Sequence, residues 1–181
     1  AISWMSVAYG NGMFIAVAYH DTSSTVTGIH RIMTSPDGIT WTGAGTSDQF
    51  RSKWHDIAFG DGRFVAVSDM KHTALGGTLT ITTTDGVNWT NVEPTDYGRW
   101  ESVAYGNGMW VAVGNGDFSS TQKQIMYSPD GLNWTSVPTP ELRGYAATAY
   151  NETFVGVTTT YEDRSNVLGE VVTGTGTSRP D

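Results

Sequence analysis

Trp4-Met5-Ser6-Val7-Ala8-Tyr9-Gly10-Asn11-Gly12-Met13-Phe14-Ile15-Ala16-Val17 is the stretch that decides the fold, because the chain repeats it. Close copies occupy residues 54–67 and 100–113, and a more divergent fourth copy occupies residues 145–157. Self-similarity at a fixed period is the signature of a repeat architecture. We therefore expect one structural unit to occur four times.

Each copy predicts two strands joined by a tight turn. The Gly-Asn-Gly or Gly-Asp-Gly in its middle supplies residues that tolerate positive φ, as a short hairpin requires. Apolar and β-branched residues follow this turn, and they favour the second strand of the pair. A third strand is predicted in every unit, at residues 30–34, 79–82, 124–127 and 167–172.

A second motif closes the first three units. Ser35-Pro36-Asp37-Gly38-Ile39-Thr40-Trp41 recurs in related form at residues 83–89 and 128–134, and the fourth unit has no such ending. Proline fixes φ, and an aspartate can accept hydrogen bonds from backbone N–H groups just after it. We therefore interpret Asp37, Asp85 and Asp130 as turn-fixing residues, with the fourth strand beginning after Trp41, Trp89 and Trp134.

The spacing between units points to a β-propeller. Trp4, Trp54, Trp100 and Tyr145 follow one another at 50, 46 and 45 residues, close to the roughly 40–50 residues of a four-stranded propeller blade. We predict an all-β fold, a single small propeller of four blades with repeats at about 4–53, 54–99, 100–143 and 144–175 and a polar tail at 176–181. Three blades would be four-stranded, and the last would be incomplete or completed by another chain.

The closing motif resembles the Asp-box of sialidase-type propellers, and the longer repeat is similar to units in bacterial and bacteriophage proteins. The resemblance implies that the Asp ties the turn and that the aromatic residue packs between neighbouring blades. Trp4, Trp54, Trp100 and Tyr145 are then equivalent inter-blade aromatics. The resemblance indicates the fold more strongly than the activity, since propellers host many unrelated functions.

Composition excludes several classes of partner. The formal net charge of −8 repels phosphate backbones and anionic lipid head groups. The chain has no cysteine, so it can form neither a disulfide nor a thiolate metal site. The four histidines lack paired ligand spacing, and we expect neither a metal nor a cofactor.

Arginines ahead of the innermost strands suggest a binding site. Arg51, Arg99 and Arg143 lie shortly before Trp54, Trp100 and Tyr145, so their side chains could converge on the mouth of a central channel. Guanidinium groups bind carboxylates bidentately. The likeness to sialidases implies that the three arginines hold a substrate carboxylate. The alternative is that each arginine stacks on its neighbouring aromatic. Loop aromatics would complete the contact surface: Phe50, Tyr97, Phe118 and Tyr161.

From the sequence we expect a non-enzymatic structural or adhesive protein, extracellular or on a bacteriophage virion surface as a decoration, knob or fibre component. Its partners would be other protein chains, by self-association or on a particle surface, with a cell-surface glycan as a further ligand. The alternative function is a lectin-like module binding sugar through the long-loop face. A third is a sialidase-like glycoside hydrolase, for which Asp56 and Glu101 are inner-strand carboxylates without an obvious catalytic pairing.

Overall fold

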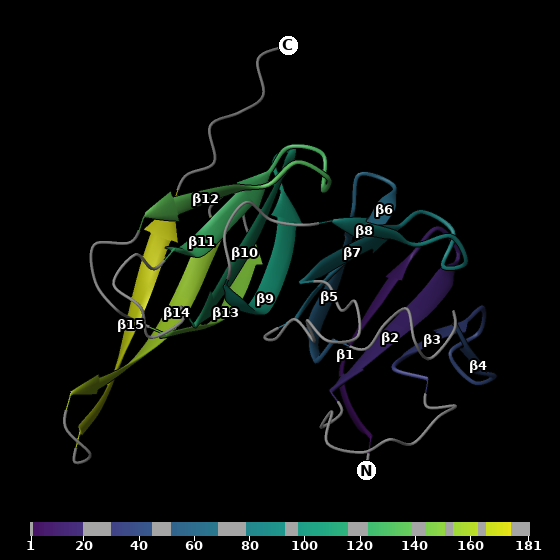
Figure 1. Ribbon diagram of the computed structural model, residues 1–181, viewed down its shortest axis with the longest axis horizontal. Coiled ribbons are helices and arrows are strands. Elements are labelled where there is room, and N and C mark those ends of the chain that lie inside the picture. The colour runs from purple at the N-terminus through teal and green to yellow at the C-terminus, as the bar shows by residue number, and fades with distance from the viewer. Residues whose placement is uncertain are drawn as a thin grey trace.

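The computed structural model describes residues 2–19, 30–44, 52–68, 79–92, 98–115, 123–138, 144–150, 154–162 and 166–174. Every regular element in these ranges is a β-strand, which confirms the all-β prediction (Figure 1). The same ranges contain no helix that is long and apolar enough to span a membrane.

The described part of the chain contains fifteen strands, which form four antiparallel sheets in chain order. The first sheet contains β1 (Ser3–Gly10), β2 (Met13–Tyr19), β3 (Ile32–Ser35) and β4 (Thr42–Gly43). The second contains β5 (Trp54–Gly60), β6 (Arg63–Ser68), β7 (Thr80–Thr83) and β8 (Thr90–Val92). The third contains β9 (Arg99–Gly106), β10 (Met109–Asn115), β11 (Lys123–Ser128) and β12 (Thr135–Pro138).

The fourth sheet has three strands in the described residues. These are β13 (Gly144–Tyr150), β14 (Phe154–Glu162) and β15 (Asn166–Gly174). Within these residues, the unit that lacks a closing motif also lacks a fourth strand. One detail of the sequence analysis is wrong here, because Tyr161 lies within β14 and not in a loop. The pairing of Tyr161 with Val167 extends the hairpin to Glu162.

The hairpin turns follow from residues that tolerate positive φ. Asn11 and Gly12 adopt φ values of 47° and 78°, and the Asp61-Gly62 and Asn107-Gly108 turns repeat this geometry. Two consecutive residues with positive φ are what a type I′ turn requires, and its twist matches that of the flanking strands. The Gly-x-Gly motifs therefore fix the register of the first hairpin in each of the first three sheets.

Each inner strand contains one extra residue directly after its aromatic. The register shifts between Trp4 and Ser6 in β1, and the same shift recurs in β5, β9 and β13. The bulged residues are Met5, His55, Glu101 and Ala146. A β-bulge re-aims a side chain and is common beside functional sites. The sequence alone does not predict these bulges.

The sheets stack through one repeated face, which we call the tryptophan face. Strand pairing places the same five register positions on it in the first three sheets. In the second sheet they are Trp54, Ile57, Ala66, Ile81 and Trp89, packed against aliphatic residues of the first sheet. In the third they are Trp100, Val103, Ala112, Met126 and Trp134, packed against the second sheet.

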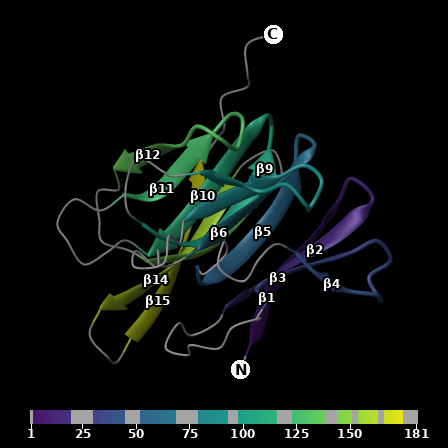
Figure 2. The same cartoon turned by 45° about the vertical axis from the view of Figure 1, so that its right-hand side comes forward.

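The four sheets form an open row and not a closed ring. Inner strand β5 lies beside β1, β9 beside β5, and β13 beside β9. The first and fourth sheets lie at opposite ends of the row, and the rotated view of Figure 2 keeps them apart. Within the described residues, no other sheet covers the tryptophan face of the first sheet.

Candidate functional site

The two middle inner strands begin with charged residues that the outer two lack. Lys53 and Arg99 precede Trp54 and Trp100, and the bulged residues that follow are His55 and Glu101. The first sheet has Ser3 and Met5 at these positions, and the fourth has Gly144 and Ala146. Lys53, His55, Arg99 and Glu101 are all half-buried. We call this set the inner-strand site.

Tyr19, at the end of β2, organises one side of the inner-strand site. The Lys53 ammonium donates to the Tyr19 hydroxyl at 3.0 Å and lies 5.0 Å from the centroid of its ring. The His55 imidazole meets the same ring edge-on, with centroids 5.5 Å apart. Since Lys53 and His55 flank the buried Trp54, the tyrosine holds both polar side chains in one place.

The Asp56 carboxylate links three sheets through hydrogen bonds. Its Oδ1 accepts from the Ser6 hydroxyl at 2.6 Å and from the Ile57 N–H at 2.9 Å. Its Oδ2 accepts from the Ser102 hydroxyl and the Val103 N–H, both at 3.0 Å. A carboxylate offers about four lone-pair sites, so all of them are occupied. Asp56 therefore ties β1, β5 and β9 together and has no lone pair left for a substrate.

Glu101 is the other carboxylate of these strands that the sequence singled out. It occupies the bulge of β9, two residues after Arg99. Within the described residues, no group of three or more His, Asp or Glu side chains is arranged to hold a metal ion.

Most of the binding residues predicted from sequence lie outside the described residues. These are Arg51, Arg143, Phe50, Tyr97 and Phe118. Only the backbone of Tyr161 and of Tyr145 is described. Arg99 is described in full, at the start of β9. The convergence of three arginines on one point stays a prediction.

The turn aspartates serve the backbone. The Asp37 carboxylate accepts from the N–H groups of Ile39 and Thr40, at 2.8 and 2.7 Å, and from the Ser35 hydroxyl at 2.9 Å. The bonds from Thr40 and Ile39 are the main reason that the pKa of Asp37 falls to about 2. Asp85 and Asp130 make the same backbone bonds two and three residues on. These carboxylates fix turns.

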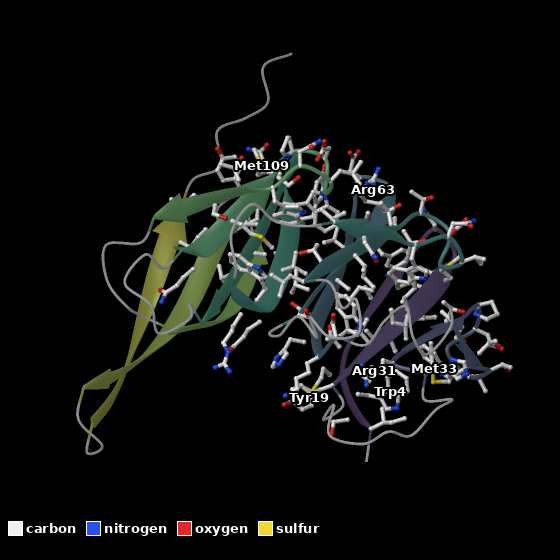
Figure 3. All side chains as sticks on the ribbon, in the orientation of Figure 1. Trp4, Tyr19, Arg31, Met33, Arg63 and Met109 are labelled. Atoms are coloured by element: carbon white, nitrogen blue, oxygen red, sulfur yellow. The ribbon has the colours of Figure 1, made fainter. Side chains whose placement is uncertain are left out.

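The tryptophan face of the first sheet contains a groove of about 580 Å³. Figure 3 labels two of its residues, Trp4 and Met33. The complete lining is Trp4, Met5, Ser6, Val7, Ala16, Met33 and Trp41. Five of these residues are the register positions that form the buried core in the second and third sheets.

Comparison with known proteins supports a propeller fold. No protein-family model matches the chain, and no curated protein does so. Among solved structures, it is similar to the GH32 β-fructofuranosidase of Bombyx mori in complex with sucrose, at 13% identity and a TM-score of 0.50. That match covers 96% of this chain but 46% of the enzyme, so the chain spans less than half of its length.

A second similar structure is an α-L-arabinofuranosidase from Clostridium thermocellum, at 14% identity and a TM-score of 0.47, covering 99% of this chain and 70% of that one. Both neighbours are five-bladed β-propeller glycoside hydrolases. The likeness to the Bombyx mori enzyme supports a β-propeller fold for this chain.

The comparison corrects the main expectation from the sequence. The main expectation, a non-enzymatic structural or adhesive protein of a virion surface, is contradicted, because the similar Bombyx mori structure is a glycoside hydrolase. None of the comparisons supports the bacteriophage, decoration or Asp-box assignments. The repeat and the unclosed blade describe the architecture of the protein and not its activity.

Proposed function

We propose that this chain is a carbohydrate-active β-propeller domain in which each sheet is one blade and the inner-strand site binds a glycan. One observation carries the proposal. Two adjacent inner strands place Lys53, His55, Arg99 and Glu101 at matching positions around their tryptophans, where the other two strands have small or uncharged residues. In a repeat built from otherwise similar residues, such a departure at one place indicates a function beyond packing.

The chemistry of the set suits a sugar. Sugar hydroxyls both donate and accept hydrogen bonds. Lys53 and Arg99 supply donors, Glu101 supplies an acceptor, and His55 can do either. The Tyr19 ring already contacts Lys53 and His55 and adds an aromatic surface at the edge of the site. If Arg51 and Arg143 extend toward the same end of the inner strands, they would enlarge the donor set.

The fold comparison supports a carbohydrate ligand. The Bombyx mori enzyme, whose structure holds sucrose, shares its fold with 96% of this chain. Loops and strand ends on a stiff scaffold are where binding residues concentrate. The inner-strand site lies at such strand ends.

Glycoside hydrolysis is the second candidate function. The hydrogen bonds to Asp56 decide which carboxyl group could take part in it. Because four donors occupy the Asp56 carboxylate, Glu101 is the carboxyl group at this site that we assign to proton transfer to or from a glycosidic oxygen.

The test is a glycan array with the wild-type chain and the variants Arg99→Ala and Glu101→Gln, followed by fluorogenic glycosides of the sugars that bind. We expect Arg99→Ala to weaken binding at least about tenfold, since a hydrogen bond from a charged group contributes about 1.5–3 kcal/mol. If the domain hydrolyses its ligand, Glu101→Gln should abolish turnover and retain binding.

Ser3→Ala is the matched control, because Ser3 occupies the register position of Lys53 and Arg99 in the first sheet. It should bind glycan as the wild type does. The proposal fails if no glycan binds, or if Arg99→Ala and Ser3→Ala bind equally well.

A further inference from the structure

Asn11, the first residue of the first hairpin turn, links the first sheet to the second. Its side-chain Nδ2 donates to the carbonyl oxygen of Gly62 at 2.8 Å and to that of Thr84 at 2.9 Å. Gly62 belongs to the hairpin turn of the second sheet, and Thr84 belongs to its closing turn. Two backbone carbonyl groups of the second sheet therefore converge on the end of this side chain.

The stack of the second sheet on the third repeats this arrangement. Gly10 lies against the Phe59 ring, and Gly60 lies in the same way against the ring of Tyr105. The closing turn of the third sheet contacts β6 of the second, just as the closing turn of the second sheet contacts β2 of the first. We therefore expect the same pair of carbonyl groups to converge at the hairpin turn of the second sheet.

The residue at this turn of the second sheet is Asp61. Its φ is 46°, against 47° for Asn11, so its side chain leaves the turn in the same direction. The carbonyl groups that receive the Asn11 bonds have their equivalents in those of Gly108 and Pro129. An amide can donate two hydrogen bonds, but a carboxylate can only accept. Asp61 therefore brings a negative charge to the place where Asn11 supplies two donors.

Arg63, two residues after Asp61, does not take the place of these donors. Figure 3 labels it at this end of the second sheet. Its Nη1 donates to the Thr82 hydroxyl at 3.4 Å, and its Cδ lies against Gly131 of the third sheet. A carboxylate and two carbonyl groups then face one another, and carboxylate and carbonyl oxygens are the ligands that calcium prefers in proteins.

We propose that Asp61 and the carbonyl oxygens of Gly108 and Pro129 bind a calcium ion between the second and third sheets. The carboxylate would supply one or two ligands, each carbonyl group one, and water the rest of the roughly six to eight that calcium takes. Because two of the protein ligands are backbone oxygens, the side-chain pattern of the sequence does not reveal the site. It lies at the opposite end of β5 from the inner-strand site, so it is independent of the proposed function.

Thermal unfolding of the intact chain in EDTA and in about 10 mM CaCl2 tests the site, because a ligand that binds only the folded state stabilises it. With a Kd of about 1 mM, as in extracellular calcium modules, we expect calcium to raise the melting temperature of the wild type by about 3–6 °C. The same concentration of MgCl2 is the control for the general effect of divalent cations on a chain of net charge −8. It should raise the melting temperature less, because Mg²⁺ requires near-ideal octahedral geometry.

Two exchanges between Asp and Asn supply matched variants. Asp61→Asn should lose the calcium response and should melt above the wild type in EDTA, because its amide can donate to both carbonyl groups. Asn11→Asp should melt below the wild type in EDTA and should show a larger calcium response, since it creates the same set of oxygens between the first and second sheets. Both residue types are favoured before Gly in such turns, so both variants should fold.

Calorimetric titration with CaCl2 then counts the ions. We expect the wild type to bind one ion, Asp61→Asn none and Asn11→Asp two. The proposal is overturned if the wild type gains no more from CaCl2 than from MgCl2. It is also overturned if the wild type and Asp61→Asn gain equally from calcium, because the effect is then general screening of the negative charge.

Discussion

The first and second sheets are built from nearly the same residues, yet the tryptophan face is exposed in the first sheet and buried in the second. Trp54, Ile57 and Phe64 of the second sheet are buried against the first sheet, whereas Trp4 and Val7 are about half exposed. The pairing register and the hairpin turn are the same in both. Whether a sheet face is buried in this fold therefore depends on the adjacent sheet and not on the repeated sequence.

The largest expected difference between the two sheets concerns their first tryptophans. We expect Trp54→Ala to lower the free energy of unfolding by about 3–5 kcal/mol, because it removes a fully buried indole and leaves a cavity. Trp4→Ala should lower it by less than about 1 kcal/mol, since its side chain is already in contact with water. Urea denaturation followed by fluorescence measures both, and equal losses would contradict the comparison.

A smaller difference is expected at the next inner-strand position, which is Asp56 in the second sheet and Ser6 in the first. Asp56→Ala leaves two hydroxyls and two N–H groups without their carboxylate, and we expect it to lower the free energy of unfolding by about 2–3 kcal/mol. Ser6→Ala removes one of those four bonds, so about 1 kcal/mol should be lost. Similar losses for the two variants would show that Asp56 does not join the sheets.

The smallest effect is expected at the closing turns, where the two sheets should behave alike. Protonation of the turn aspartates weakens the fold only at acid pH, because backbone N–H groups lower the pKa of Asp37 to about 2. The stability that Asp37 adds over Asp37→Asn should be complete above about pH 4, the ordinary pKa of the group in an unfolded chain. It should disappear as the pH falls through the native pKa near 2.

Asp85 sharpens this test. The Asn88 side chain donates to its carboxylate at 2.7 Å, and this bond is the first of the causes that lower the pKa of Asp85 further than that of Asp37. The melting temperatures of wild type and Asp85→Asn should therefore converge only at a lower pH than those of wild type and Asp37→Asn. Convergence at the same pH would exclude a role for the Asn88 amide.

Much of the fold could be predicted from the sequence, because its determinants are local. The Asn11-Gly12 pair specifies its hairpin through φ values that few residues tolerate. The closing motif specifies its turn through hydrogen bonds that span two or three residues. The motif is absent after residue 143, and the described residues of the last sheet form three strands and not four.

The site could be predicted only in part. Arg99 and Glu101 drew attention because each is adjacent to the repeated Trp100. The bulges that set Glu101 and His55 apart from their neighbours escaped prediction, since the sequence does not show which residue lacks a cross-strand partner. A comparison of the four copies at the position after the aromatic could have found them, because Met5, His55, Glu101 and Ala146 share no chemistry.

The sequence by itself determined what short-range physics controls: the strands, the hairpins, the closing turns and the order of the four units. Only the tertiary structure decided which faces meet, that Asp56 accepts from three inner strands at once, and that the groove around Trp4 stays open. Burial and long-range hydrogen bonds depend on residues some 50 positions apart in the chain, as with Ser6 and Asp56. No local pattern shows which of four similar sheets will have its tryptophan face buried by another described sheet.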